Sequence, residues 1–182
     1  MTIAGRALLT VMILGPVASN AVAQARVPDS GMAAVGGNIG IIIPKDPFET
    51  DVALSGTFDY YVTPRVSLRP GVLWANPGVK DHDESLQRVG LLFDVIYNWE
   101  RGKWHPFAGA GVGAYFFQPK AFGESFREDE KNLGATIGGG IEYFMNRTTV
   151  FKGEGQYHFI DQGDLPQSPS ALTLMIGLKK YF

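Results

Sequence analysis

Residues 171–182, ALTLMIGLKKYF, decide the fold of this chain. A large aliphatic side chain stands at every second position of this stretch, at Leu172, Leu174, Ile176 and Leu178. The positions between them hold small or polar residues, among them Thr173, Gly177 and Lys179. A period of two is typical of a β-strand that has one apolar and one polar face. We therefore expect a two-faced strand at the C-terminal end.

Two other stretches repeat this alternation. In residues 86–99 the apolar positions are Val89, Leu91, Phe93, Val95, Tyr97 and Trp99. The opposite face of that stretch is mainly polar, with Leu92 and Ile96 as exceptions. In residues 51–62 the apolar positions Val52, Leu54, Phe58 and Tyr60 oppose Asp51, Ser55, Thr57 and Asp59. Strands with two different faces are thus expected along the whole chain.

After Pro28 the helical period nearly disappears, and eight stretches have the strand pattern. Each has the length of about 9–11 residues, or slightly more, that a tilted strand needs to cross a membrane. They span residues 33–43, 51–62, 65–75, 86–99, 104–117, 131–144, 148–160 and 171–182.

The connections between these stretches alternate in length. Tight turns are indicated at Pro64, at Arg101-Gly102 and at Asn146-Arg147. The other connections are longer and rich in charge, Gly and Pro, and they span residues 44–50, 76–85, 118–130 and 161–170. Outer-membrane barrels alternate short periplasmic turns with long extracellular loops in this way. The rhythm predicts an all-β fold, an eight-stranded antiparallel up-and-down transmembrane β-barrel with both termini in the periplasm.

The alternation alone does not say which face points outward, because a soluble barrel would place its apolar face inside. Side-chain size favours the membrane arrangement, since the polar face is rich in Gly, Ser, Thr and Ala and fits the narrow interior of eight strands. Aromatic residues gather near the strand ends, as in the girdles at lipid–water boundaries. They are Tyr60, Tyr61, Trp74, Tyr97, Trp99, Trp104, Phe116, Phe117, Tyr143, Phe144, Tyr181 and Phe182.

Charged residues on the polar face need partners if they point into a narrow interior. Four polar residues in succession, Lys152, Glu154, Gln156 and His158, share one face of residues 148–160. Charges on the same face of other stretches are the candidates for pairing. We predict an interior salt-bridge network of Asp59, Arg69, Arg88, Asp94, Glu142, Lys152, Glu154 and Lys179.

The N-terminus has the three regions of a secretory signal peptide. Arg6 precedes an apolar run from Ala7 to Val17, and small residues follow up to Ala25. The apolar run is too short for a spanning helix, which needs about 20 residues. We expect a signal peptide at residues 1–25, cut after Ala25 or alternatively after Ala23, and a barrel domain at residues 26–182.

Composition excludes several classes of function. The chain has 16 basic and 18 acidic residues and a net charge of −2, so its overall charge indicates binding neither to nucleic acid nor to an anionic membrane surface. It has no cysteine, which excludes disulfides, thiolate metal sites and cysteine nucleophiles.

Several motifs resemble the eight-stranded outer-membrane barrels of the OmpA/OmpX and opacity-protein kind. WHPFAGAGVG at residues 104–113 is similar to their fifth strand, and GGGIEYF at residues 138–144 to their sixth. The resemblance covers about residues 33–182. It implies a location in the outer membrane of a Gram-negative bacterium, among lipid and lipopolysaccharide. The printed chain ends with the barrel pattern, so the peptidoglycan-binding domain of OmpA is not expected.

The C-terminal residues GLKKYF, 177–182, are similar to the signal by which the barrel-assembly machinery recognises its clients. The resemblance assigns this signal to Leu178, Tyr181 and Phe182. It implies that the assembly machinery is a partner during biogenesis.

No strong catalytic or ligand motif is present, and we predict no catalytic residue, metal or cofactor. His158, with Glu154 and Ser168, is the one constellation that could serve a hydrolase. The acidic clusters 81–84 and 128–130 are more typical of solvated loops than of a cation site, because such a site needs converging oxygens. Gly109, Gly111 and Gly113 indicate close strand packing rather than a phosphate loop.

The sequence therefore predicts a monomeric, non-enzymatic outer-membrane barrel with a structural or surface-interaction role, adhesion-like rather than an open pore. Its four long loops would contact an extracellular ligand. Two alternatives remain at this point: an outer-membrane enzyme that modifies lipid A, and a soluble periplasmic ligand-binding barrel.

Overall fold

A computed structural model gives the architecture, and it describes residues 28–45, 48–78, 84–100, 102–121, 124–125, 130–161 and 168–182. Within these ranges the chain forms strands and no helix. In the same ranges no helix is long and apolar enough to cross a membrane. The expected signal peptide, residues 1–25, lies outside the described residues.

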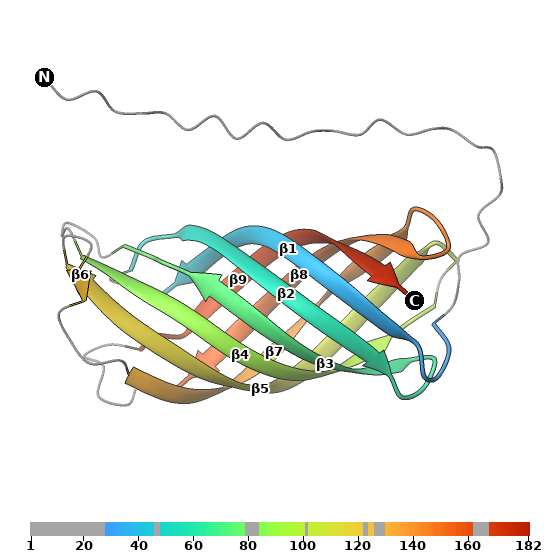
Figure 1. Ribbon diagram of the computed structural model, residues 1–182, viewed down its shortest axis with the longest axis horizontal. Helices are drawn as coiled ribbons and strands as arrows, with labels where there is room; N and C mark the ends of the chain where they lie inside the picture. Colours follow the sequence, from blue (N-terminus) through green and yellow to red (C-terminus); the bar gives the residue numbers. More distant parts are fainter. Residues whose placement is uncertain are drawn as a thin grey trace, which may run out of the picture.

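Eight long strands form one closed antiparallel sheet, which is drawn in Figure 1 as a barrel of tilted strands. They are β1 (Ala33–Pro44), β2 (Asp51–Tyr61), β3 (Val66–Ala75), β4 (Glu84–Asn98), β5 (Trp104–Ala121), β7 (Glu130–Phe144), β8 (Thr149–Ile160) and β9 (Ala171–Tyr181). Each strand pairs with its neighbour in sequence, and β1 pairs with β9 from Ala34↔Tyr181 to Pro44↔Ala171. The predicted eight-stranded up-and-down barrel is confirmed.

The strand bounds agree with the sequence pattern to within a few residues, except at one place. β5 continues to Ala121, and a two-residue strand, β6 (Glu124–Ser125), pairs with its end through Lys120↔Ser125 and Ala121↔Glu124. The sequence placed these residues in a loop.

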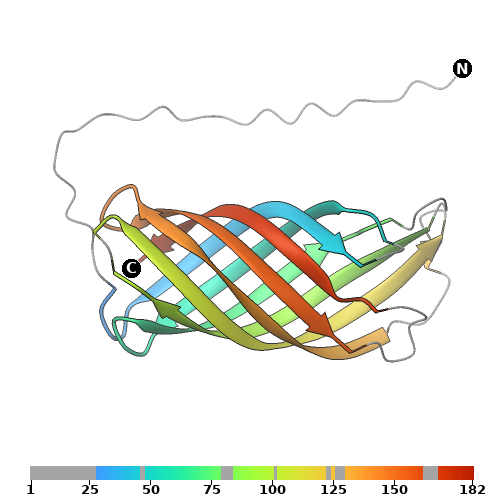
Figure 2. The same cartoon turned by 180° about the vertical axis from the view of Figure 1, so that it is seen from behind.

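The two ends of the barrel differ. One end, here called the turn end, carries the connections 62–65, 99–103 and 145–148 and the C-terminus (Figure 1). The other end, the loop end, carries the longer connections 45–50, 76–83, 122–129 and 161–170. It is on the left in Figure 1 and on the right in Figure 2. The predicted alternation of short and long connections is present.

Local chemistry explains the tight turns. Gly102 has a φ of 65°, a left-handed conformation that glycine adopts without a steric penalty. In the turn 145–148 the Oδ1 of Asn146 accepts hydrogen bonds from the backbone N of Thr148 at 3.0 Å and of Thr149 at 2.9 Å. Such an Asn side chain replaces backbone partners that the turn leaves unpaired.

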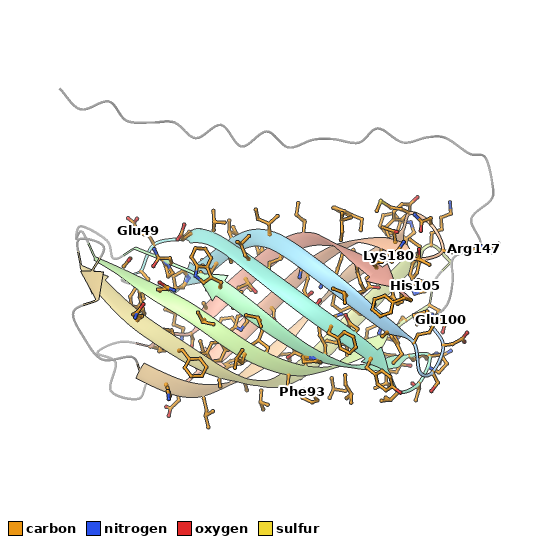
Figure 3. The ribbon with its side chains drawn as sticks, viewed as in Figure 1. Glu49, Phe93, Glu100, His105, Arg147 and Lys180 are labelled. Atoms are coloured by element: carbon orange, nitrogen blue, oxygen red, sulfur yellow. The ribbon has the colours of Figure 1, made fainter. Side chains whose placement is uncertain are left out.

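The apolar faces of the strands point outward. Large hydrophobic side chains remain exposed on every long strand, including Ile39 at 52%, Val112 at 62% and Ile176 at 55%. They stand off the outside of the wall in Figure 3, where Phe93 is labelled. A monomer in water does not expose apolar surface on this scale. This outer surface fits hydrocarbon.

The predicted aromatic girdles are present only in part. Trp74, Trp99, Trp104, Tyr60 and Phe182 are exposed on the outside, as predicted. Tyr61, Phe117, Phe144 and Tyr181 are buried in the lumen instead, and the girdle prediction was wrong for these four. Each is the sequence neighbour of an outward residue, and neighbours in a strand point to opposite faces.

Glycines on β5 allow its close contact with β4, as the sequence indicated. Gly109, Gly111 and Gly113 lie on the inner face, and a Cβ at Gly111 would collide with the carbonyl of Phe93 and with Asp94. These glycines let the two strands approach each other.

Candidate functional site

Six charged side chains meet inside the barrel near the turn end. They come from β2, β3, β7, β8 and β9, and we call them the charge cluster: Asp59, Arg69, Glu142, Lys152, Glu154 and Lys179. The alternation that turns apolar residues outward directs these six inward. Glu154 has a side chain that is 14% exposed, and the other five side chains are at most 2% exposed.

Arg69 lies at the centre of the charge cluster. Its Nε is 2.7 Å from Oδ1 of Asp59, and its Nη1 is 3.3 Å from Oε1 of Glu154. Its Nη2 is 3.9 Å from Oε1 of Glu142 on β7, across the lumen. The ring of Phe107 lies 5.2 Å from the guanidinium carbon. A planar guanidinium with several donors suits this bridging of three carboxylates.

The two lysines complete the charge cluster. Lys152 Nζ lies 2.6 Å from Oε2 of Glu154, and Lys179 Nζ lies 3.4 Å from Oδ2 of Asp59. Lys179 also forms an ion pair with Glu142. Three acids and three bases thus balance within the cluster, which is the condition for burying charge.

Two tyrosines that the sequence assigned to girdles belong to this site. Tyr181 donates its hydroxyl to Oε2 of Glu142 at 2.9 Å, and the hydroxyls of Tyr61 and Tyr181 are 2.8 Å apart. The ammonium of Lys179 lies 5.3 Å from the Tyr181 ring. The same period of two could have found them, because Tyr61 is two residues from Asp59 and Tyr181 two from Lys179.

Asp94 and Arg88, the other two residues of the predicted network, lie outside the cluster. Asp94 accepts hydrogen bonds from Thr136 and, at 3.1 Å, from Nε2 of Gln156. Arg88 lies six residues before Asp94 on β4, about 20 Å toward the loop end. The structure therefore divides the eight predicted residues into a group of six and two separate charges.

Arg88 is fully buried without a carboxylate partner among the described residues. Its Nη2 donates to the carbonyl of Pro169 at 2.6 Å, and its guanidinium carbon lies 5.0 Å from the Phe117 ring. Among the residues that the structure describes, its Nε and Nη1 have no hydrogen-bond partner. The sequence pattern found its inward direction, but the absence of an acidic neighbour depends on strand register.

A small cavity lies beside the charge cluster. The centre of a water molecule can occupy about 20 Å³ of this cavity. The lining includes Arg69, Asp94, Glu154, Gln156 and Thr173. A site of that size holds about one water.

The hydrolase constellation does not assemble. His158 is buried, and its ring nitrogens contact the hydroxyl of Tyr115 at 2.8 Å and that of Thr173 at 3.1 Å. Ser168 contacts Ser170 at 3.2 Å instead of His158. Neither Glu154 nor Ser168 is a hydrogen-bond partner of His158 in the described part of the chain, so the relay from acid to base to nucleophile is missing there.

No metal site is visible in the described ranges, where no group of three His, Asp or Glu side chains converges. The side chains of the acidic clusters 81–84 and 128–130 lie outside the described residues.

Comparison with known families decides the membership of the chain. Residues 7–179 match the family model described as "Outer membrane protein beta-barrel domain". The chain belongs to this family. As an outer membrane β-barrel it lies in the cell outer membrane, where its apolar surface contacts lipid. A soluble periplasmic barrel, one of the two alternatives from the sequence, is thereby overturned.

Solved structures with the same fold include three small outer membrane barrels at low identity. Neisserial surface protein A (NspA) has a TM-score of 0.71 at 11% identity, covering 84% of this chain and 98% of that one. The N-terminal β-barrel domain of Pseudomonas aeruginosa OprF has 0.62 at 13%, covering 85% and 100%. Ail, the attachment invasion locus protein of Yersinia pestis, has 0.60 at 13%, covering 84% and 99%.

A search of curated protein sequences finds no match. At these identities the structural neighbours show the fold of this outer membrane β-barrel and nothing finer.

Proposed function

We propose that this protein is a closed, non-conducting barrel that has a structural role in the outer membrane and presents its loop end for surface interactions. One observation carries this proposal. The charge cluster and the aromatic side chains around it occupy the lumen near the turn end and are almost wholly inaccessible to water. An eight-stranded barrel has an interior that side chains can fill completely, so a continuous aqueous path is not expected.

Conductance in a planar lipid bilayer tests this proposal. The refolded protein should produce no stable single-channel steps in 1 M KCl. A matched variant, Lys179→Ala with Glu142→Ala, removes one acid and one base from the cluster and should increase the frequency of current steps. Steady conductance by the unaltered protein would contradict the closed lumen.

In outer membrane barrels, long loops face the outside and short turns face the periplasm. We therefore assign the loop end to the cell surface and both termini to the periplasm. Adhesion of cells with and without the gene tests the surface role. Replacing residues 122–129 by a Gly-Ser linker of equal length should lower adhesion while the barrel stays folded. Unchanged adhesion after replacement of each long loop would oppose the assignment.

The proposal includes no enzymatic step. The buried His158, held between Tyr115 and Thr173, favours a structural role for this residue over hydrolysis of lipid A. His158→Ala should leave the mass spectrum of lipid A unchanged in cells that carry the gene. A new lipid A species that disappears with this variant would restore the enzymatic alternative.

We also propose that the assembly machinery recognises the last strand, and that the folded protein is a monomer among phospholipid and lipopolysaccharide. Leu178 and Phe182 are exposed on the outer face of β9, whereas Tyr181 points inward to Glu142. Deleting Phe182 should lower the amount of folded protein in cells but not its refolding yield in detergent. Equal losses in both settings would indicate a purely structural role.

A further inference from the structure

Three exposed basic residues lie at the turn end, and we call them the cationic rim: Lys103, Arg147 and Lys180. None of the three forms an ion pair within the described residues. Lys180 Nζ donates to the hydroxyl of Thr148 at 2.9 Å, which places it beside the turn that carries Arg147. Figure 3 shows Arg147 and Lys180 at the same end of the barrel. The rim thus presents unneutralised positive charge.

A row of outward side chains lies next to the rim on adjacent strands. Trp104 pairs in register with Tyr143, Tyr143 with Phe151, and Phe151 with Leu178. The rings of Trp104 and Tyr143 are 4.6 Å apart. This row crosses β5, β7, β8 and β9 without interruption. Aromatic side chains at barrel ends lie at the level of lipid headgroups, so the cationic rim is expected at the level of the phosphates.

The rest of the turn end adds to this positive charge. Arg65 is a fourth exposed cation there, and the exposed acids described at this end are Asp29 and Glu100. At the loop end the balance is reversed. Acidic residues outnumber basic ones in each of the longer segments, 45–51, 79–84, 120–131 and 161–170. The two ends therefore differ in sign, and the turn end attracts anions.

We propose that the cationic rim binds the phosphate of an anionic glycerophospholipid in the leaflet at the turn end. Arg147 supplies a planar donor fork and the lysines supply point charges, the two ways in which proteins hold phosphate. The row from Trp104 to Leu178 contacts the glycerol and the upper acyl chains of the same lipid. This inference depends on the location of the protein in the membrane and is independent of the closed lumen and the adhesion-like role.

Tryptophan quenching by brominated lipid tests the inference at each end separately. A variant with Trp74→Phe and Trp99→Phe retains Trp104 at the rim, whereas Trp99→Phe with Trp104→Phe retains Trp74 at the loop end. Each is reconstituted in vesicles of phosphatidylcholine with an increasing fraction of brominated phosphatidylglycerol. Brominated phosphatidylcholine in unbrominated phosphatidylglycerol is the reciprocal measurement. Heat-modifiable migration on gels confirms that both variants are folded.

Trp104 should report a preference for phosphatidylglycerol over phosphatidylcholine, and Trp74 should report none. Charges near an anionic membrane surface contribute about fivefold in binding for each cation. Lys103→Gln, Arg147→Gln and Lys180→Gln should therefore each lower the preference at Trp104 by up to about fivefold. The triple variant should abolish it, as should 1 M salt.

A control with Lys45→Gln and Lys131→Gln, two exposed cations at the loop end, should leave the Trp104 preference unchanged. Equal quenching of Trp104 by the two brominated lipids would overturn the proposal. A preference that survives the triple variant would do the same, because the rim would then not be its source. Likewise, an equal preference at Trp74 would show that the attraction is not located at the turn end.

Discussion

Arg69 and Arg88 are both buried guanidinium groups, and their surroundings predict opposite effects of the same substitution. Arg69 contacts three carboxylates, so Arg69→Met leaves buried acids without their central partner. Loss of one partner of a buried ion pair costs about 3–5 kcal/mol. Arg88 has no carboxylate partner among the described residues, so Arg88→Met removes a buried charge that is poorly compensated. Arg88→Met should therefore lower the unfolding free energy by less than about 1 kcal/mol, or it should raise this free energy.

Urea unfolding in lipid vesicles, followed by tryptophan fluorescence, measures both free energies. The comparison is matched because both variants replace a buried arginine by the same side chain. If Arg88→Met were as destabilising as Arg69→Met, an acid outside the described ranges would have to pair with Arg88.

The inward direction of every charge in the predicted network follows from alternation, but the pairing of these charges does not. Arg69 is the register partner of Asp94, yet its side chain contacts Asp59 on the other neighbouring strand and crosses to Glu142. Strand tilt and side-chain length decide such contacts, and both are properties of the closed barrel. The tyrosines at positions 61 and 181 were missed because aromatic residues near strand ends are typical of girdles, and that rule outweighed the alternation.

The cost of a charge on the outer face of the barrel should depend on its depth in the membrane. Ile39 lies near the middle of β1 and is exposed outside, whereas Val62 follows the end of β2 at the turn end. Ile39→Lys should lower the unfolding free energy by about 2–4 kcal/mol, and Val62→Lys by about 0–1 kcal/mol. The same urea titration in vesicles measures both. Equal costs at the two positions would contradict the placement of β1 across the hydrocarbon.

Close packing between β4 and β5 gives a second prediction for the elements. A Cβ at Gly111 would collide with the carbonyl of Phe93, whereas a Cβ at Gly153 on β8 would meet nothing within 4 Å. Gly111→Ala should therefore destabilise the barrel by about 1–3 kcal/mol because the strands must separate. Gly153→Ala should be neutral or stabilise by up to about 1 kcal/mol. A neutral Gly111→Ala would mean that β4 and β5 can separate without cost.

The strands were predictable because each carries its own alternation, and the extension of β5 was not. Residues Gln118-Pro119-Lys120 contain a proline and a charge, which are typical of a loop. They become strand because β4 continues alongside them, from Gln87↔Gln118 to Glu84↔Ala121, and β6 pairs on the other side. That pairing depends on the tertiary structure, so the local sequence pattern does not predict it.

For the molecule as a whole, closure depends on the pairing of the first and last strands. A chain that ends at Ser170 lacks β9. β1 then keeps only β2 as a paired strand, and β8 keeps only β7, so each has one unpaired edge. Such a chain should not show the heat-modifiable migration of a folded barrel in detergent. Adding residues 171–182 as a separate peptide should restore some of the folded band, and a peptide with the same composition in scrambled order should not. Folded migration of the truncated chain alone would contradict the need for β9 in closure.

The contact between β1 and β9 also imposes an order on biosynthesis. Until β9 has been translated, the strand that joins β1 to β8 is missing, so the barrel cannot close. An incomplete chain that lacks β9 therefore cannot form a smaller closed barrel. Closure of the barrel can therefore only follow the synthesis of β9, however early the other seven long strands are made.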